Sequence, residues 1–392
     1  MITAPLGFRA AAVASGIKPD RLDLALVVAD RPSPAAGVFT TNRVQAAPVQ
    51  VSRDHLAAGR ARAIVVNAGC ANAATGVGGL RDARDMAAAV AAALGCEVQE
   101  VVVASTGVIG VPLPMDKVRA GIARGAAALS VEAGPEAARA IMTTDTRPKE
   151  VRVDVPLGST TAVIGAMAKG AGMIAPNLAT LLAFFTTDAS VPRDLLQRAL
   201  REAVGDSLNR ITVDGDTSTN DCAVILASGA RAGAAVAEGG TFNAFRRGLV
   251  EASHRLAEML VRDGEGVTKV AEVRVGGAKS GADADRVART VAESPLVKTA
   301  LHGGDPNWGR ILAAVGRSGV DLDVDQVAIW IGDVWVAEGG HARAHEEKDA
   351  AKAMQEDPVR FRIHLGAGTA SGWMWTSDFS HGYVDINAHY RS

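Results

Sequence analysis

The 392-residue sequence is 48% hydrophobic and 21% charged, so it can bury one large core or two moderate ones. Its 41 lysines and arginines against 43 aspartates and glutamates leave a net charge of −2, which argues against nucleic acid as a partner. No apolar run approaches the roughly 20 residues that cross a bilayer, and the N-terminus lacks a leader pattern. We therefore expect a cytoplasmic protein without a membrane partner.

The predicted elements of the first half alternate between buried strands and alanine-rich helices. Strands are predicted at 63–67, 101–103 and 150–155, and helices at 81–94 and 115–129. The strands are rich in valine, and the last of them alternates between apolar and charged residues, as a half-solvated strand does. The helix at 81–94 carries alanine on its packed face.

The second half continues the mixture, with helices predicted at 191–207, 245–263 and 341–356 and strands at 224–226 and 360–364. Such mixing predicts an α/β (α+β) fold.

The glycine-rich turn at 276–281 is the predicted domain boundary, between a core of about 1–276 and a smaller C-terminal domain of about 277–392.

The three cysteines, Cys70, Cys96 and Cys222, are odd in number and never in a CxxC spacing. They predict neither a disulfide framework nor a zinc ribbon.

The segment from Lys169 to Thr180 is rich in small residues and precedes the apolar run 181–185. One interpretation is that Thr180 simply fills space as a β-branched strand residue. The other is that its hydroxyl attacks the open carbonyl of Ala179 in an N-to-O acyl shift, which frees a new N-terminal threonine. The α-amine of such a residue, with a pKa of about 7.7–8.0, can act as the base for its own hydroxyl.

Two polar segments are further candidates. Ser105-Thr106-Gly107 follows a predicted strand, where it is either an ordinary turn or a source of backbone N–H groups for a developing oxyanion. The loop 214–221 begins like a calcium loop, but Thr219 and Ile225 stand where glycine and glutamate are needed. It is either a network of turn hydrogen bonds or the wall of a polar site.

The remaining motifs do not predict a metal or nucleotide site. His341 and His345 are four residues apart on a predicted helix, but no third ligand accompanies them, which favours a solvated helix face. The glycines at 76–79 lack the lysine of a phosphate-binding loop. Glu265, between two glycines, either caps a helix or faces a cationic amine, and the loop 302–310 holds a Trp and an Arg that suit a site.

Taken together, these motifs resemble the ornithine acetyltransferase / glutamate N-acetyltransferase family of arginine biosynthesis. The resemblance spans nearly the whole chain, in Gly7 to Ala10, Gly16 to Lys18, Ala36 to Asn42, Ala71 to Ala73, Ser105 to Gly110, Lys169 to Thr180, Thr212 to Asp216, Asp263 to Gly266, Asp305 to Arg310 and Tyr383 to Asn387. So many motifs in one order are more specific than any single site.

The resemblance implies that the chain cuts itself between Ala179 and Thr180, into an α chain of residues 1–179 and a β chain of residues 180–392. Thr180 would then be the nucleophile, and Thr106 and Gly107 the oxyanion hole. By the same resemblance, the substrate-binding residues are Thr146 (favoured over its neighbours Thr143 and Thr144), Lys169, Thr180, Glu265, Asn387 and Ser392.

The implied fold is a layered αββα sandwich with a smaller C-terminal α/β domain, in an α2β2 heterotetramer. The implied chemistry is ping-pong: the threonine takes acetyl from N-acetyl-ornithine, ornithine leaves, and glutamate collects the acetyl group. No cofactor is expected, with acetyl-CoA as an optional co-substrate. An amidase or aminopeptidase that uses water as acceptor is the enzymatic alternative, and an uncleaved amino-acid-binding regulator the non-enzymatic one.

The sequence departs from the family's pattern at a few positions. Ala68 and Cys70 stand where the family commonly has Ser and Asn, Val267 replaces an Ala, and Ser392 replaces a terminal Thr. None of these changes removes a catalytic group.

Overall fold

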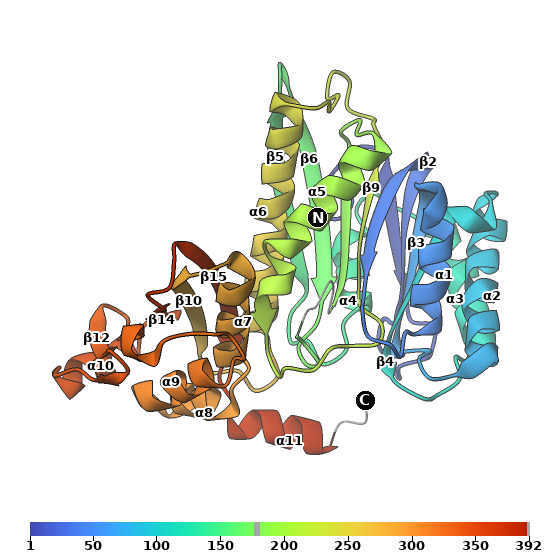
Figure 1. The fold of residues 1–392 in the computed structure, drawn as a ribbon. Helices are drawn as coiled ribbons and strands as arrows, with labels where there is room; N and C mark the ends of the chain where they lie inside the picture. The colour runs from blue at the N-terminus through green and yellow to red at the C-terminus, as the bar shows by residue number, and fades with distance from the viewer. Residues whose placement is uncertain (176–180, 390–392) are drawn as a thin grey trace. The chain divides into compact units, whose positions relative to one another are not determined.

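The computed structural model describes residues 1–175 and 181–389 (Figure 1). Their contacts divide them into a first unit, residues 1–209 and 216–260, and a second unit, residues 210–215 and those from 261 on. The division falls at Leu260 and Val261, inside helix α6 (Gly240–Arg262), rather than at the predicted turn 276–281. The reason is that strand β10 (Val270–Ala278) runs up to this turn as an inner strand of the second unit's sheet.

The first unit contains a sheet with the order β4-β3-β2-β9-β7-β6-β5, and β1 pairs with β2 beside this path. Its strands are β1 (Phe8–Val13), β2 (Leu24–Phe39), β3 (Arg60–Cys70), β4 (Val101–Val108), β5 (Lys149–Leu157), β6 (Thr160–Lys169), β7 (Leu182–Thr187) and β9 (Cys222–Ala227). The long strand β2 pairs with β3 through Leu24 to Val28 and with β9 through Ala35 to Phe39. It therefore links two halves of the sheet.

Helices α1 (Ala47–His55), α2 (Gly76–Leu94), α3 (Met115–Ala127), α5 (Arg193–Gly205) and α6 cover the outer faces of these two halves. The side chains of α4 (Gly134–Ala140) belong instead to the core between the halves. Helices α1, α2 and α3 lie along β2, β3 and β4 (Figure 1), and their side chains share one core with residues such as Leu26 and Val65. On the other half, α5 contacts β2 and β9, and Gly248 of α6 lies against Val155 of β5.

Alternate residues of the strands point into a second core between the two halves. There Val27 and Ile64 from one half meet Phe184 and Val224 from the other, with α4 alongside. The layers therefore run helix, sheet, sheet, helix, and the predicted fold class is confirmed.

The second unit has its own sheet, with the order β13-β12-β11-β14-β10-β15-β8. The other strands are β8 (Ile211–Thr212), β11 (Ala328–Ile331), β12 (Val334–Glu338), β13 (His341–Ala342), β14 (Val359–His364) and β15 (Ala370–Ser377), and the helices are α7 (Gly281–Ala292), α8 (Pro295–Gly303), α9 (Trp308–Gly316), α10 (Glu347–Ala353) and α11 (His381–His389). Val273, Val287, Leu301 and Phe361 belong to its separate hydrophobic core.

The predicted surface helix 341–356 is only partly present. Gly339 and Gly340, with φ of 61° and 71°, turn the chain back so that β13 pairs with β12, and the helix α10 begins only at Glu347. His341 and His345 therefore do not share a helical face. Within 1–175 and 181–389, no three His, Cys, Asp or Glu side chains come together as metal ligands.

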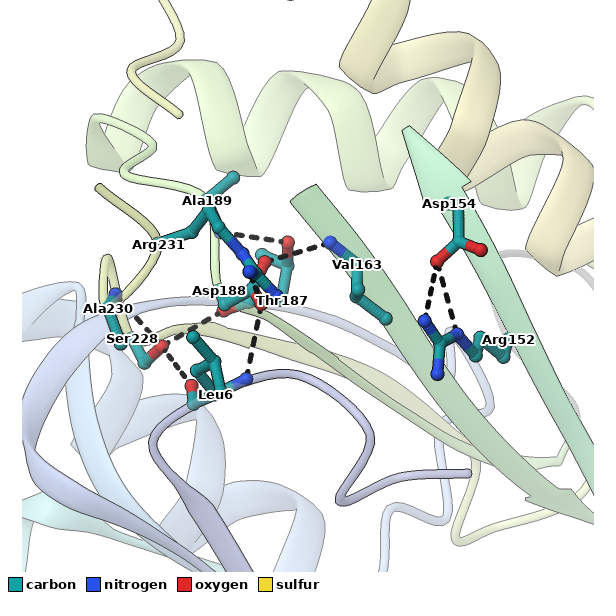
Figure 2. Close-up of polar contacts among 10 residues, drawn as sticks. All are labelled: Leu6, Arg152, Asp154, Val163, Thr187, Asp188, Ala189, Ser228, Ala230 and Arg231. Atoms are coloured by element: carbon teal, nitrogen blue, oxygen red, sulfur yellow. Dashed lines mark hydrogen bonds and ion pairs between the residues drawn. The ribbon is translucent and has the colours of Figure 1, made fainter. Parts of the chain in front are cut away.

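A buried carboxylate fixes the end of β7 (Figure 2). Asp188 is fully buried and accepts hydrogen bonds from the backbone N–H groups of Val163 (2.8 Å) and Leu6 (3.2 Å). Its Oδ2 is 3.0 Å from Nη2 of Arg231, and the Ser228 hydroxyl donates to the Leu6 carbonyl. One side chain thus joins the N-terminal loop to β6 and to the strand that follows the predicted cleavage segment.

No helix in the described part of the chain has the length and apolarity to span a membrane.

Candidate active site

The carboxyl ends of the parallel strands β3 and β4 carry the predicted oxyanion residues. Ser105, Thr106 and Gly107 lie within β4, because its pairing with β3 continues as far as Gly69 and Cys70. The interpretation of this tripeptide as an ordinary turn is therefore wrong. Gly107 has a φ of 129°, and a Cβ there would lie 2.3 Å from the carbonyl carbon of Gly69, so only glycine fits.

A buried hydrogen-bond network fixes this strand end. The Ser105 hydroxyl donates to Asn67 Oδ1 at 2.6 Å, and Asn67 Nδ2 donates to the Cys70 carbonyl at 2.8 Å. Asn220 Nδ2 donates to the carbonyls of Ala71 and Ser105. The loop 214–221 thus forms internal hydrogen bonds and also walls a polar region, and its buried network holds the backbone beside Thr106 rigidly.

Lys169 brings a positive charge to the same place. It ends β6, pairs with Leu182 at the start of β7, and is only 8% exposed. Its Nζ donates a hydrogen bond to Thr106 Oγ1 at 3.2 Å. Two of the residues predicted as functional, distant in the sequence, are therefore in contact.

Asp145 is the ionised acid of the cluster. Its buried Oδ1 accepts hydrogen bonds from Lys149 Nζ at 2.6 Å and from the Gly170 backbone N–H at 2.7 Å. Burial alone would raise the pKa of Asp145, but the charges of Lys169 and Lys149 and the hydrogen bonds hold it at about 2.

Asp221, directly before β9, is the second acid of the cluster and was not singled out as a titratable group from the sequence. Burial raises its pKa well above the usual value, more than the hydrogen bonds from Ser218 and the charge of Lys169 lower it. Its Oδ2 has no hydrogen-bond partner in the described part of the chain. Two carboxyl groups whose pKa values shift in opposite directions therefore both interact with Lys169, an arrangement typical of sites that move protons. The signal in the sequence is an acid that opens the buried strand 222–227.

A cavity of about 360 Å³ opens next to this cluster. Thr143, Asp145 and Thr146 line it together with Lys18, Arg21 and Arg139. Two of the three candidate threonines of the turn, Thr143 and Thr146, thus face the same space, and Thr146 is the more exposed of them.

Glu265 and Asn387, predicted to bind substrate, are brought together in the second unit. Asn387 Nδ2 on α11 donates to Glu265 Oε2 at 2.8 Å, and Glu265 is 7% exposed. Gly266, with a φ of 67°, allows this approach, since a Cβ there would lie 2.2 Å from the backbone nitrogen of Tyr383. The hydrogen bond from Asn387 therefore fixes the position of the Glu265 carboxylate.

The loop 302–310 has structural roles. Asn307 Oδ1 caps α9 by accepting from the Arg310 backbone N–H, and the Arg310 guanidinium donates to the Leu296 carbonyl at 2.9 Å. His302 Nδ1 lies 2.8 Å from Asp378 Oδ2.

The predicted cleavage site, Ala179–Thr180, and the predicted substrate contact Ser392 lie outside the described residues. The chain on both sides of the cleavage site is held to its neighbours. The Thr217 hydroxyl donates to the Ala175 carbonyl at 3.0 Å, and the Leu181 carbonyl accepts from the Cys222 N–H at 2.9 Å.

A family model described as the ArgJ family matches residues 9–392. The chain belongs to the ArgJ family. It is 49% identical over 395 residues to the arginine biosynthesis bifunctional protein ArgJ of Symbiobacterium thermophilum, covering 100% of this chain and 98% of the relative. The protein of the same name from Geobacter sulfurreducens is 48% identical over 391 residues, which cover 98% of this chain and 99% of the relative. The resemblance drawn from the motifs is confirmed, and the chain is an enzyme.

Two solved structures of relatives are similar to parts of the chain. The crystal structure of arginine biosynthesis bifunctional protein ArgJ from Bacillus halodurans is 40% identical, with a TM-score of 0.52. The match covers 54% of this chain and 100% of that solved chain. The ornithine acetyltransferase of Mycobacterium tuberculosis complexed with ornithine is 48% identical, with a TM-score of 0.42. The match covers 45% of this chain and 95% of that solved chain.

Proposed function

We propose that the protein is a self-processing acetyltransferase of arginine biosynthesis that moves acetyl from N-acetyl-ornithine to glutamate. The observation that carries the proposal is the contact between Lys169 and Thr106. It joins the start of the segment that contains Ala179 and Thr180 to the strand end predicted to supply the oxyanion hole. The name of the relatives, arginine biosynthesis bifunctional protein, supports the pathway.

Processing comes first in this proposal. The Thr180 hydroxyl attacks the Ala179 carbonyl, the peptide C–N bond breaks, and the acyl group moves to oxygen while the nitrogen becomes a free amine. Water then hydrolyses the ester and releases the α chain, and backbone N–H groups at Thr106 and Gly107 stabilise the oxyanion. The solved Bacillus halodurans chain supports cleavage, because its whole length corresponds to 54% of this chain, the share that residues 180–392 make up.

The acetyl group is transferred in two half-reactions. The Thr180 hydroxyl attacks the acetyl carbonyl of N-acetyl-ornithine and gives up its proton to its own α-amine, and ornithine leaves with a proton on the released nitrogen. The α-amine of glutamate then attacks the acetyl ester, forms N-acetyl-glutamate and restores the hydroxyl. The Glu265 carboxylate, oriented by Asn387, suits the ornithine amine, and Lys169 suits the substrate carboxylate.

Several further properties belong to this proposal. We expect no cofactor and no metal, and an α2β2 assembly of processed chains in the cytoplasm. The word bifunctional in the relatives' name favours acetyl-CoA as a second acetyl donor to the same threonine. Ser392 and Thr146 complete the proposed substrate contacts.

Intact mass and ornithine release test the proposal together. The wild-type protein should appear as two chains, release one equivalent of ornithine without glutamate, and turn over continuously with glutamate. Thr180→Ala should stay one chain and release none, whereas Thr299→Ala, on the exposed side of α8, should behave as wild type. Sustained ornithine release without glutamate would show that water is the acceptor, and an uncut chain with full activity would refute the proposal.

A further inference from the structure

The cavity in the first unit is lined by three cations to which the proposed function gives no role. Lys18 and Arg21 come from the loop after β1, and Arg139 from the end of α4. The cavity's acid, Asp145, is already neutralised by Lys149 and hydrogen-bonded to the Gly170 N–H. The cavity therefore carries an excess of positive charge.

Each of the three cations can still bind a ligand. Arg21 is exposed and makes no hydrogen bond or ion pair within residues 1–175 and 181–389. Arg139 has Glu136 as its acidic neighbour, at 3.6 Å on the surface of α4. Lys18 Nζ donates one hydrogen bond, to the Met142 carbonyl at 2.8 Å, which leaves two of its three N–H groups for a ligand.

The loop that presents Lys18 is held in place by its own aspartate. Asp23 is fully buried and accepts hydrogen bonds from the backbone N–H groups of Ser15 (2.6 Å), Ile17 (2.7 Å) and Lys18 (2.9 Å). Burial and, next, the charge of Arg21 lower the pKa of Lys18. An anion bound between these two side chains would relieve their repulsion.

The cavity adjoins the reacting centre. Asp145, on its wall, is hydrogen-bonded to Gly170, and the preceding residue, Lys169, contacts Thr106. Asp145, Gly170 and Lys169 therefore connect the wall of the cavity to the proposed oxyanion hole.

We propose that Lys18 and Arg21 bind the side-chain carboxylate of the acetyl acceptor, glutamate. The proposal rests on the proposed function, in which one nucleophile serves two substrates that share an amino-acid core and differ in side-chain charge. The planar guanidinium of Arg21 matches a carboxylate through two parallel hydrogen bonds, and the threonine hydroxyls of the turn can add more. The same cations repel the side-chain amine of N-acetyl-ornithine, so the cavity selects the acceptor over the donor.

Arg21→Gln tests the proposal, with Lys18→Met as a second variant. In the processed full-length enzyme, each should raise the KM for glutamate about tenfold, which corresponds to about 1.4 kcal/mol. Single-turnover ornithine release from N-acetyl-ornithine should be unchanged, which also shows that the variants fold and process. The preference for glutamate over glutamine as acceptor should fall about tenfold. Arg119→Gln on α3, which removes a guanidinium paired with Asp85, is the matched control and should change none of these values.

Three results would overturn the proposal. An unchanged glutamate KM would exclude a role for these cations in acceptor binding. An equal loss in ornithine release would assign the cavity to a group that both substrates share. A rise confined to the KM for acetyl-CoA would identify the ligand as a phosphate. If the wild-type enzyme itself releases no ornithine, the proposed function fails, which is a distinguishable outcome.

Discussion

Two buried carboxyl groups beside Lys169 have opposite pKa shifts, and single residues therefore set the pH response of the site. Asp145 is held ionised by two lysines, whereas Asp221 has an unpaired oxygen and a raised pKa. The pKa of the same amino acid is thus lowered at one position by neighbouring cations and raised at the other by burial.

Asp145→Asn should change the acid dependence of stability. The pKa of Asp145 is about 2 when folded against 3.8 when unfolded, so its ionised form stabilises the fold by about 2 kcal/mol above pH 4. That contribution is lost as the pH falls through about 2. In urea unfolding, the variant should be less stable at pH 7 and show a smaller loss below pH 4. Asp221→Asn is the control, because burial shifts the pKa of Asp221 in the opposite direction, and equal slopes in the two variants would contradict the assignment.

At the scale of the elements, the close pairing of β3 and β4 explains why the proposed oxyanion residues belong to a strand. Gly107 continues the parallel ladder beside Gly69, and the network from Asn67, Ser105 and Asn220 fixes its backbone. A rigid strand end holds N–H groups more accurately than a free turn does.

Gly107→Ala should damage both the strand pair and the reaction. The added Cβ would lie 2.3 Å from the Gly69 carbonyl carbon and 2.6 Å from the Cys70 nitrogen. We expect a loss of about 3 kcal/mol in the free energy of unfolding and about 100-fold in single-turnover ornithine release. Gly110→Ala is the matched control, because Gly110 also has a positive φ but no atom within 4 Å of the added Cβ. Equal effects of the two substitutions would show that backbone strain alone is responsible.

At the scale of the whole molecule, each unit has its own sheet and its own hydrophobic core. Phe184 lies in a core of the first unit and Phe361 in that of the second. Since the cores that contain Phe184 and Phe361 are each built from residues of one unit, we expect the two units to respond separately to damage in these cores.

Phe361→Ala should destabilise the protein by about 3–5 kcal/mol through the cavity that it creates. Hydrogen exchange measured by mass spectrometry should accelerate over residues 210–215 and 261–389, with little change in the first unit. Phe184→Ala should give the reverse pattern. Acceleration throughout the chain in both variants would show that the units unfold as one.

Local patterns in the sequence predicted many of the elements correctly. The strand at 63–67 and the helices at 81–94 and 191–207 were visible because their hydrophobic periodicity depends only on near neighbours. The interpretation of Ser105 to Gly107 as a turn was wrong because pairing with a distant strand overrode the local signal. The helix predicted at 341–356 begins only at Glu347 because a hairpin forms first.

The sequence by itself determined the family, the class of fold and the residues to consider, because long motifs in a fixed order are a property of the chain alone. Only the tertiary structure decided that Lys169 contacts Thr106, that the pKa values of Asp145 and Asp221 shift in opposite directions, and that cations gather around a cavity. These features arise between residues far apart in the chain, where burial and opposing charges, rather than local spacing, set the energy of each group.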